Sequence, residues 1–257
     1  MPGRAGLKRT LSAVLTFLTI VIGLLALWQA IIVLGDLPRY ILPPPLAVLA
    51  KIGTAHAMLL EEALVTLREI LAGFAIGAVF GAAAAILISA FPRIGRFIWP
   101  VLVVLQSFPV FVIAPMLVLW FGFGIASKVV MTTIIVFFPV ASSFADGLRR
   151  TDPEVVAAAR LDGAGHFEML RFIRLPLALP QLFSGLRIAA PLAPLGAVVG
   201  EWVGSAGGLG FLMVQANARM QTETVFAAML ILALEAVLFR KAVDLAAPFF
   251  TRWSHED

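Results

Sequence analysis

The sequence contains no cysteine, which excludes disulfide bonds, thiolate metal sites and cysteine nucleophiles. It is also poor in charge: Asp, Glu, Lys and Arg make up 13% of its 257 residues, against about 25% in a typical soluble domain. Hydrophobic residues make up 61%, and the mean hydropathy is +1.02. This composition indicates an integral membrane protein, long enough for roughly five to seven spanning helices of about 20 residues each.

Residues that could carry out catalysis are few and scattered. His56, His166 and His255 fall on different segments without metal-ligand spacing, so we expect no metal site and no catalytic centre. The glycine-rich run 204–210 lacks the Gly-Lys-Ser/Thr ending of a phosphate loop, and we interpret it as a flexible or re-entrant turn. The net charge of +4 fits basic membrane loops better than a nucleic-acid surface. The chain is therefore not expected to be an enzyme or to hold a cofactor.

Long uncharged runs predict the membrane spans. Residues 1–10 form a basic N-terminal segment. The uncharged run that follows is longer than a signal-peptide core of roughly 7–15 residues, so we expect this run to be retained as a span. The expected spans are Leu11–Leu34, Ile70–Phe91, Phe97–Phe121, Val129–Ala145, Ile188–Gly200 and Val225–Phe239. The sequence thus predicts an all-α, polytopic protein with about six transmembrane helices in residues 11–245, followed by a tail, 246–257.

The first two spans are separated by a proline-rich turn, Pro43–Pro45. Apolar residues then recur at helical spacing among charges from Leu46 onward, which predicts an interfacial helix before the second span. Within the second span, Gly73, Gly77 and Gly81 lie four residues apart, so they share one face. Such a ridge of small residues predicts close packing against another helix.

Later spans contain prolines and carboxylates that need an explanation. Pro109 and Pro115 predict a kinked third helix. Glu235 lies about one turn from the basic end of the expected last span, where snorkelling or pairing would explain it. Glu201 ends the fifth span, and it is either an outer-interface residue or a lining residue of a translocation path.

Basic residues predict the orientation. With both termini in the cytoplasm, only five of the nineteen basic residues lie outside: Arg39, Lys51, Arg68, Lys128 and Arg219. The one long polar interruption, residues 146–180, is then cytoplasmic.

Helix signals divide this polar segment into two short helices. Asp152 can cap the first, Pro153 suits its first position, and Gly163 would end it. The second helix is expected over His166–Arg174, cut by Leu175-Pro176. A loop of this length with defined caps is usually functional, and its small side chains suit docking into a groove on a partner.

The spacing within this segment resembles the EAA loop of ABC-importer permeases. Ala157-Ala158-Ala159 is followed after three residues by Gly163 and after nine more by Ile173-Arg174-Leu175-Pro176, although the family's glutamate falls on Ala157. The resemblance implies that this loop, with Glu154 at its helix start, docks into a cytoplasmic ATPase. The implied ATPase-coupling residues are Glu154, Ala157, Ala158, Ala159, Gly163, Ile173, Leu175 and Pro176.

A wider resemblance, from Ile41 to Asp244, is to the nitrate/sulfonate/taurine type of permease, with a second recognisable block at Gln106–Lys128. Gly200–Gly204 and Gln215–Thr222 look most like permeases for hydroxymethylpyrimidine, a thiamine precursor. The resemblance implies a type I ABC-importer transmembrane domain in a bacterial inner membrane. It also implies a homodimer that works with two ATPase subunits, which bind ATP-Mg, and an extracytoplasmic binding protein.

The candidate translocation path comprises Glu201, Gln215 and Asn217. Two alternatives stay open: the same type of permease for sulfonate, taurine or nitrate, and a secondary transporter driven by an ion gradient. The second would need mid-membrane carboxylates, for which Glu201 and Glu235 are the candidates. An intramembrane enzyme would need a nucleophile–base pair, which the sequence does not offer.

Overall fold

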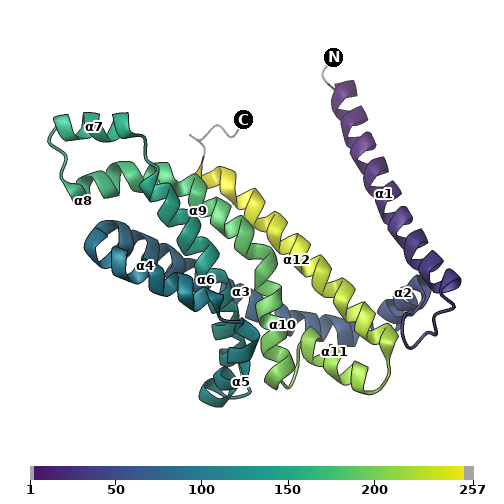
Figure 1. Cartoon of the computed structure of the whole chain (residues 1–257). Coiled ribbons are helices and arrows are strands. Elements are labelled where there is room, and N and C mark those ends of the chain that lie inside the picture. Colours follow the sequence, from purple (N-terminus) through teal and green to yellow (C-terminus); the bar gives the residue numbers. More distant parts are fainter. Residues whose placement is uncertain (1–2, 252–257) are drawn as a thin grey trace.

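The structure is a computed structural model. It describes the backbone of residues 3–251 and the side chains of residues 15, 16 and 18–251. Every regular element in this part of the chain is a helix (Figure 1). The elements are α1 (Gly3–Leu34), α2 (Pro45–Thr54), α3 (His56–Ala90), α4 (Pro92–Ser107), α5 (Val110–Phe121), α6 (Ile125–Arg149), α7 (Pro153–Leu161), α8 (His166–Met169), a π-helical turn (Leu170–Arg174), α9 (Leu175–Ala189), a 3₁₀ turn (Ala190–Leu192), α10 (Ala193–Gly204), α11 (Leu209–Ala218) and α12 (Thr222–Phe250).

Four helical stretches in residues 3–251 are long and apolar enough to cross a membrane: α3, α6, the continuous stretch from α8 to α10, and α12. α4 and α5 meet this criterion only as a pair, which is bent by 94°. The apolar part of α1 that the criterion covers, Leu18–Leu34, is a shorter helix. The expected all-α, polytopic fold is confirmed, with four or five long spans and α1 beside them.

Two boundary predictions were wrong. The charged residues after His56 do not belong to a separate interfacial helix, because α3 begins at His56 and continues to Ala90. α12 reaches Phe250 instead of ending at Phe239, so Glu235 lies in mid-helix and not one turn from an end. In both cases a charged stretch was taken as a boundary, although a helix continues through charges when they project beyond the membrane or pack against a neighbouring helix.

Prolines acted differently from expectation at two places. The third span is not a single kinked helix: Phe108, extended as residues before proline usually are, separates α4 from α5. By contrast, Pro176 does not cut the helix that starts at His166. A π-helical turn, Leu170–Arg174, precedes α9, so Pro176 lies in the first turn of α9, where its missing N–H costs little.

α6 lies at the centre of the packed bundle. Glycines on α3 and α9 let both of these helices come close to it. A β-carbon at Gly73 would lie 2.4 Å from Thr132 Cβ, and one at Gly77 would lie 2.8 Å from Val136 Cβ. On the other side, a β-carbon at Gly185 of α9 would lie 2.9 Å from Ser143 Cβ. The predicted glycine ridge of α3 is therefore confirmed as a packing surface.

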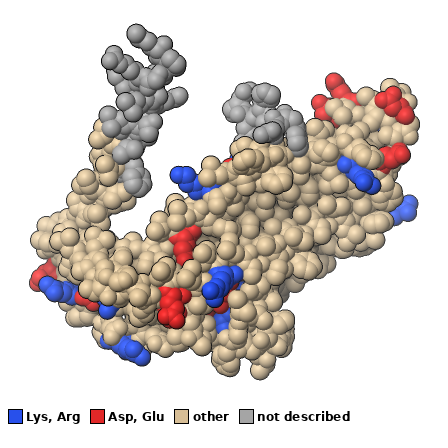
Figure 2. All heavy atoms as spheres, turned by 180° about the vertical axis from the view of Figure 1, so that it is seen from behind, with Lys and Arg blue, Asp and Glu red and all other residues tan. Residues whose placement is uncertain are grey.

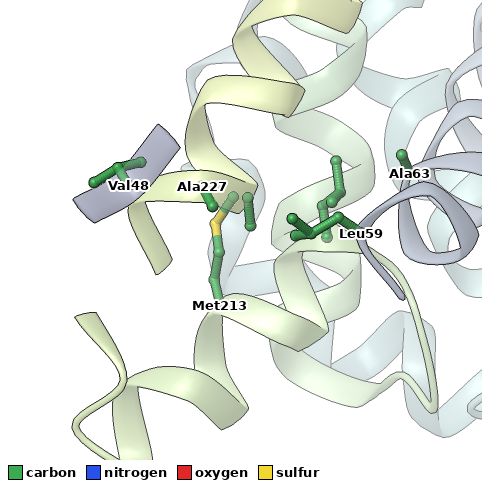
Figure 3. Close-up of a cluster of buried hydrophobic side chains, with 7 residues drawn as sticks. Val48, Leu59, Ala63, Met213 and Ala227 are labelled. Atoms are coloured by element: carbon green, nitrogen blue, oxygen red, sulfur yellow. The ribbon is translucent and has the colours of Figure 1, made fainter. Parts of the chain in front are cut away.

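A buried apolar cluster joins α2, α3, α11 and α12 (Figure 3). It contains Val48, Leu59, Ala63, Met213 and Ala227, drawn from elements that are far apart in the sequence. α1 meets this region near its end, where Trp28 and Phe226 place their ring centroids 5.6 Å apart. The rest of α1 leans away from the other helices (Figure 1).

The molecule has two ends, named here the α7 end and the α11 end. α1 begins and α12 ends toward the α7 end, while α2, α5 and α11 lie toward the other (Figure 1). On the face seen in Figure 2, most charged side chains gather near these two ends, and a broad uncharged surface separates them. This distribution is the one expected of a protein whose middle lies in lipid.

Candidate functional site

The segment predicted to couple the chain to an ATPase begins with α7, a capped helix that projects from the bundle (Figure 1). Asp152 caps its start by accepting a hydrogen bond of 2.8 Å from the Glu154 amide. At its end, Gly163 has a φ of 85°, and the Ala164 amide donates to the Ala159 carbonyl over 2.9 Å. This is a Schellman-type ending, which needs the left-handed backbone that glycine adopts without strain.

The surface of α7 is largely exposed. Ala157 and Ala158 are exposed, whereas Ala159 faces inward and is buried. Leu161, at the tip, is 90% exposed, and Phe167 in α8 is also exposed. Apolar side chains held out on a rigid, capped helix form a surface suited to a protein partner.

α8 fixes this projecting helix to the bundle. His166 Nε2 lies 3.0 Å from the Ala90 carbonyl at the end of α3, and Phe167 meets Phe91 edge to face. Leu170 is buried in a cluster with Leu148 and other residues of α6. These contacts attach α8 to the end of α3 and the following π-helical turn to α6.

The remaining coupling residues lie in a continuous helix. Ile173, Leu175 and Pro176 are half-buried in the stretch that runs without interruption for 39 residues from His166 to Gly204. At about 1.5 Å per residue, such a helix spans most of the molecule. It connects the coupling segment directly to Glu201 near the α11 end.

Glu201 lies in a buried polar cluster between α3, α10 and α11. Its side chain is 1% exposed; one carboxylate oxygen accepts from the Thr66 hydroxyl over 2.7 Å, and the other accepts from the Gly210 amide. The Thr66 hydroxyl in turn accepts from the Leu209 amide over 2.8 Å. These bonds satisfy free amides at the start of α11, so the cluster holds α11 on the bundle.

Lys128 supplies the positive charge of this cluster. Its side chain is fully buried, and its ammonium group donates to the carbonyls of Phe123, Gly124 and Gly204. Glu69 is buried close to both Glu201 and Lys128, with which its carboxylate interacts electrostatically. The cluster therefore connects α3 and α10 to the turn that precedes α6.

The glycine-rich turn before α11 is an ordered part of this cluster. Gly208 has a φ of 104°, its amide donates to the Glu62 carboxylate, and a β-carbon there would lie 2.2 Å from Glu201 Oε1. Only glycine fits this position. The turn is therefore held by Glu62 and Glu201, so of the two expected forms, flexible or re-entrant, the flexible one was wrong.

Sequence reasoning missed Glu62, Thr66, Glu69 and Lys128 as members of this cluster. The sequence predicts Lys128 only as one of five basic residues on the outer side of the membrane, and it assigns no role to the other three. An isolated charge among apolar residues in a spanning segment is itself a signal of a paired, buried group. The hydrogen bonds Thr66–Glu201 and Lys128–Gly204 join residues 135 and 76 positions apart, so no local pattern could reveal them.

A cavity of about 710 Å³ lies between α10, α11 and α12. Its lining is mainly apolar, includes Trp202 and Asn217, and contains no charged residue. Of the three predicted path residues, only Asn217 lines it. Gln215 is half-buried on α11 outside this cavity, and Glu201 is enclosed in the polar cluster described above.

A profile of the family described as "Binding-protein-dependent transport system inner membrane component" matches residues 77–253. The chain belongs to this family. A probable ABC transporter permease protein of Haemophilus influenzae is 47% identical to it, covering 86% of this chain and 90% of the relative. The predicted ABC-importer permease is thereby confirmed: the chain is a permease subunit, whose relatives are membrane subunits of transporters.

Two further relatives carry more specific names. The riboflavin transport system permease protein RibX of Chloroflexus aurantiacus is 34% identical, over 90% of this chain and 87% of its own length. The formylaminopyrimidine transport permease protein ThiX of Halalkalibacterium halodurans is also 34% identical, over 83% and 86%.

The fold matches that of a solved transporter. The structure titled "Inward facing conformations of the MetNI methionine ABC transporter" aligns with a TM-score of 0.67, covering 77% of this chain and 98% of that chain. At 21% identity the match shows the shared fold, that of a type I ABC-importer transmembrane domain.

Proposed function

We propose that this permease imports a small, uncharged heteroaromatic solute, a thiamine precursor such as hydroxymethylpyrimidine. The observation that carries the proposal is the cavity between α10, α11 and α12, which offers the Trp202 ring, the Asn217 amide and no charge. An aromatic ring suits stacking and an amide suits hydrogen bonding to ring nitrogens. The formylaminopyrimidine name of one relative supports the same class of solute.

We also propose that the α7 end faces the cytoplasm. The majority of the basic residues placed by the charge pattern as cytoplasmic lie on segments at that end, and both termini are then cytoplasmic. Two copies of the chain would pair, and two ATPase subunits would supply ATP hydrolysis. A binding protein would deliver the solute to the α11 end.

In this proposal the coupling residues Glu154, Ala157–Ala159 and Gly163 receive the movement of the ATPase. The uninterrupted helix His166–Gly204 transmits it to Glu201. Glu201 acts on the path indirectly, because its carboxylate holds the start of α11, which carries Gln215 and Asn217. Movement of α10 would then reshape the cavity.

Reconstituted uptake tests the solute. Proteoliposomes with the permease, its ATPase and its binding protein should accumulate hydroxymethylpyrimidine and not taurine, another sulfonate or nitrate. Asn217→Ala should reduce uptake about tenfold through loss of a hydrogen bond to the solute. Asn217 is exposed, so this change should leave folding intact, and Arg219→Gln on the same exposed segment is a control expected to transport normally.

The second candidate is the same type of permease for a sulfonate, taurine or nitrate. Such anions call for a cationic or amide-rich site, whereas the cavity lining has no basic residue. Uptake of taurine alone would reject the proposal. Accumulation by proteoliposomes that contain only this chain and an ion gradient would instead support a secondary transporter.

A further inference from the structure

A basic pocket lies near the α7 end, apart from the coupling surface and from the apolar cavity. It has a volume of about 410 Å³, between the end of α3, the start of α4, the end of α6 and the π-helical turn. Arg96, Arg149 and Arg174 converge on it from three different elements, and none of its lining residues is acidic. Three guanidinium groups around one cavity form a site for an anion.

Two polar atoms of the pocket's lining residues lack partners within residues 3–251. Ser89 Oγ and Arg174 Nε are both buried, and neither makes a hydrogen bond to the described part of the chain. Buried donors usually have a partner, and leaving one unpaired costs about 1–3 kcal/mol. Both groups can donate to an oxygen, so they fit the same anion as the three arginines.

The pocket is shaped by close packing. A β-carbon at Gly95 would lie 2.7 Å from Ile88 Cγ2, so this glycine lets α4 come near the end of α3. The Arg149 guanidinium lies 5.0 Å from the centre of the Trp99 ring, a cation–π contact that orients it. Two pocket elements are thus held in place without an internal carboxylate.

The surface beside the pocket indicates where the anion comes from. Directly after Arg96, α4 presents Phe97, Val101 and Val104, which are exposed and share one face of the helix. Phosphate groups of lipids lie where the charged surface of a membrane protein meets its apolar surface. Here that boundary falls within one turn of a single helix.

We propose that this pocket binds the phosphate of an anionic phospholipid, whose acyl chains lie along the exposed apolar face of α4. The cavity volume is within the roughly 300–1,000 Å³ of small-molecule sites, which accommodates a glycerophosphate head group. Basic pockets between spanning helices are a known arrangement for anionic lipid head groups. With the orientation proposed above, the lipid belongs to the cytoplasmic leaflet.

Native mass spectrometry of the purified transporter, with its ATPase bound, tests the proposal. The complex is delipidated and titrated with phosphatidylglycerol or with phosphatidylcholine. We expect phosphatidylglycerol to be retained about tenfold more strongly, and Arg96→Gln together with Arg174→Gln to remove that preference. Because Arg174 is partly buried, Arg96→Gln alone is a second variant: Arg96 is exposed, and its loss should lower retention several-fold without affecting folding.

The matched control is Arg93→Gln together with Arg150→Gln, which removes the same charge from neighbouring positions outside the pocket. It should retain phosphatidylglycerol like the unmodified chain. Equal loss in control and pocket variants, or unchanged retention in both, would overturn the proposal. Displacement of the lipid by millimolar inorganic phosphate would assign the site to a soluble anion instead. Lipid retention only after removal of the ATPase would assign the pocket to an acidic group of that subunit.

Discussion

The hydroxyl of Thr66 on α3 donates a hydrogen bond of 2.7 Å to the carboxylate of Glu201 on α10, 135 residues later in the chain. The same hydroxyl accepts from the Leu209 amide at the start of α11. Thr66 therefore connects α3 to both sides of the glycine-rich turn. At this point α3, the end of α10 and the start of α11 are held in one arrangement.

Thr66→Val should loosen this arrangement. Valine keeps the shape but leaves the Leu209 amide and one Glu201 oxygen without a partner, so we expect a destabilisation of about 1–3 kcal/mol. Thermal unfolding in detergent measures it. Thr54→Val is the matched control, because the exposed Thr54 hydroxyl bonds only to carbonyls of its own helix, and little change is expected. Equal effects of the two changes would contradict the role given to Thr66.

Lys128→Met should be more severe. It removes the buried cation, abolishes three hydrogen bonds to carbonyls and leaves Glu69 and Glu201 together without their positive partner. Breaking a buried pair on one side costs about 3–5 kcal/mol, so low yield of folded protein is expected. Adding Glu69→Gln should recover part of the loss. Additive losses in this double-mutant cycle would show that Glu69 and Lys128 act independently.

Gly163→Ala should weaken coupling through backbone strain and not through a clash. Nothing lies within 4 Å of a β-carbon there, but the φ of 85° costs an alanine about 1–2 kcal/mol. We expect Gly163→Ala to reduce solute uptake several-fold without changing membrane insertion. Gly163→Asn should reduce uptake less, because asparagine tolerates this backbone conformation. Gly165→Ala is the control, since Gly165 has a φ of −73° and ordinary space around it. Uptake by Gly163→Ala equal to that of the control would contradict the coupling role.

Gly77→Ala should separate α3 from α6. The added carbon would lie 2.8 Å from Val136 Cβ, and overpacking of this kind typically costs about 1–3 kcal/mol. Thermal unfolding again gives the measure. Gly53→Ala, in α2 with open space around it, should be neutral or slightly stabilising because alanine favours a helix. A Gly77→Ala protein as stable as the Gly53→Ala protein would show that the ridge is not a tight contact.

Local features of the fold were predictable from the sequence. Runs of apolar residues indicated most of the spans, the spacing of Gly73, Gly77 and Gly81 located a packing face, and Asp152 and Gly163 bounded a short helix. Each of these predictions depends on residues within a few turns of one another, so the sequence of a single helix is enough to make it. The coupling motif was recognisable for the same reason.

Breaks and continuations were harder to predict. Proline at 109 ends a helix, but proline at 176 does not, because the preceding π-helical turn brings Pro176 into the first turn of α9. Charge misled the boundary predictions at Ile70 and Phe239, where the helix continues because it packs against other helices. In each case the deciding contact lies outside the local sequence.

The sequence by itself determined that the chain is a helical membrane protein of the ABC-permease family with a capped polar segment, because hydropathy and motif spacing are local properties. The tertiary structure decided which distant segments meet. It joined α8 to α10 in one helix, enclosed Glu201 with Thr66 and Lys128, and left Asn217 on a cavity. These depend on how the helices are rotated and packed against one another, which places residues more than 100 positions apart within hydrogen-bonding distance.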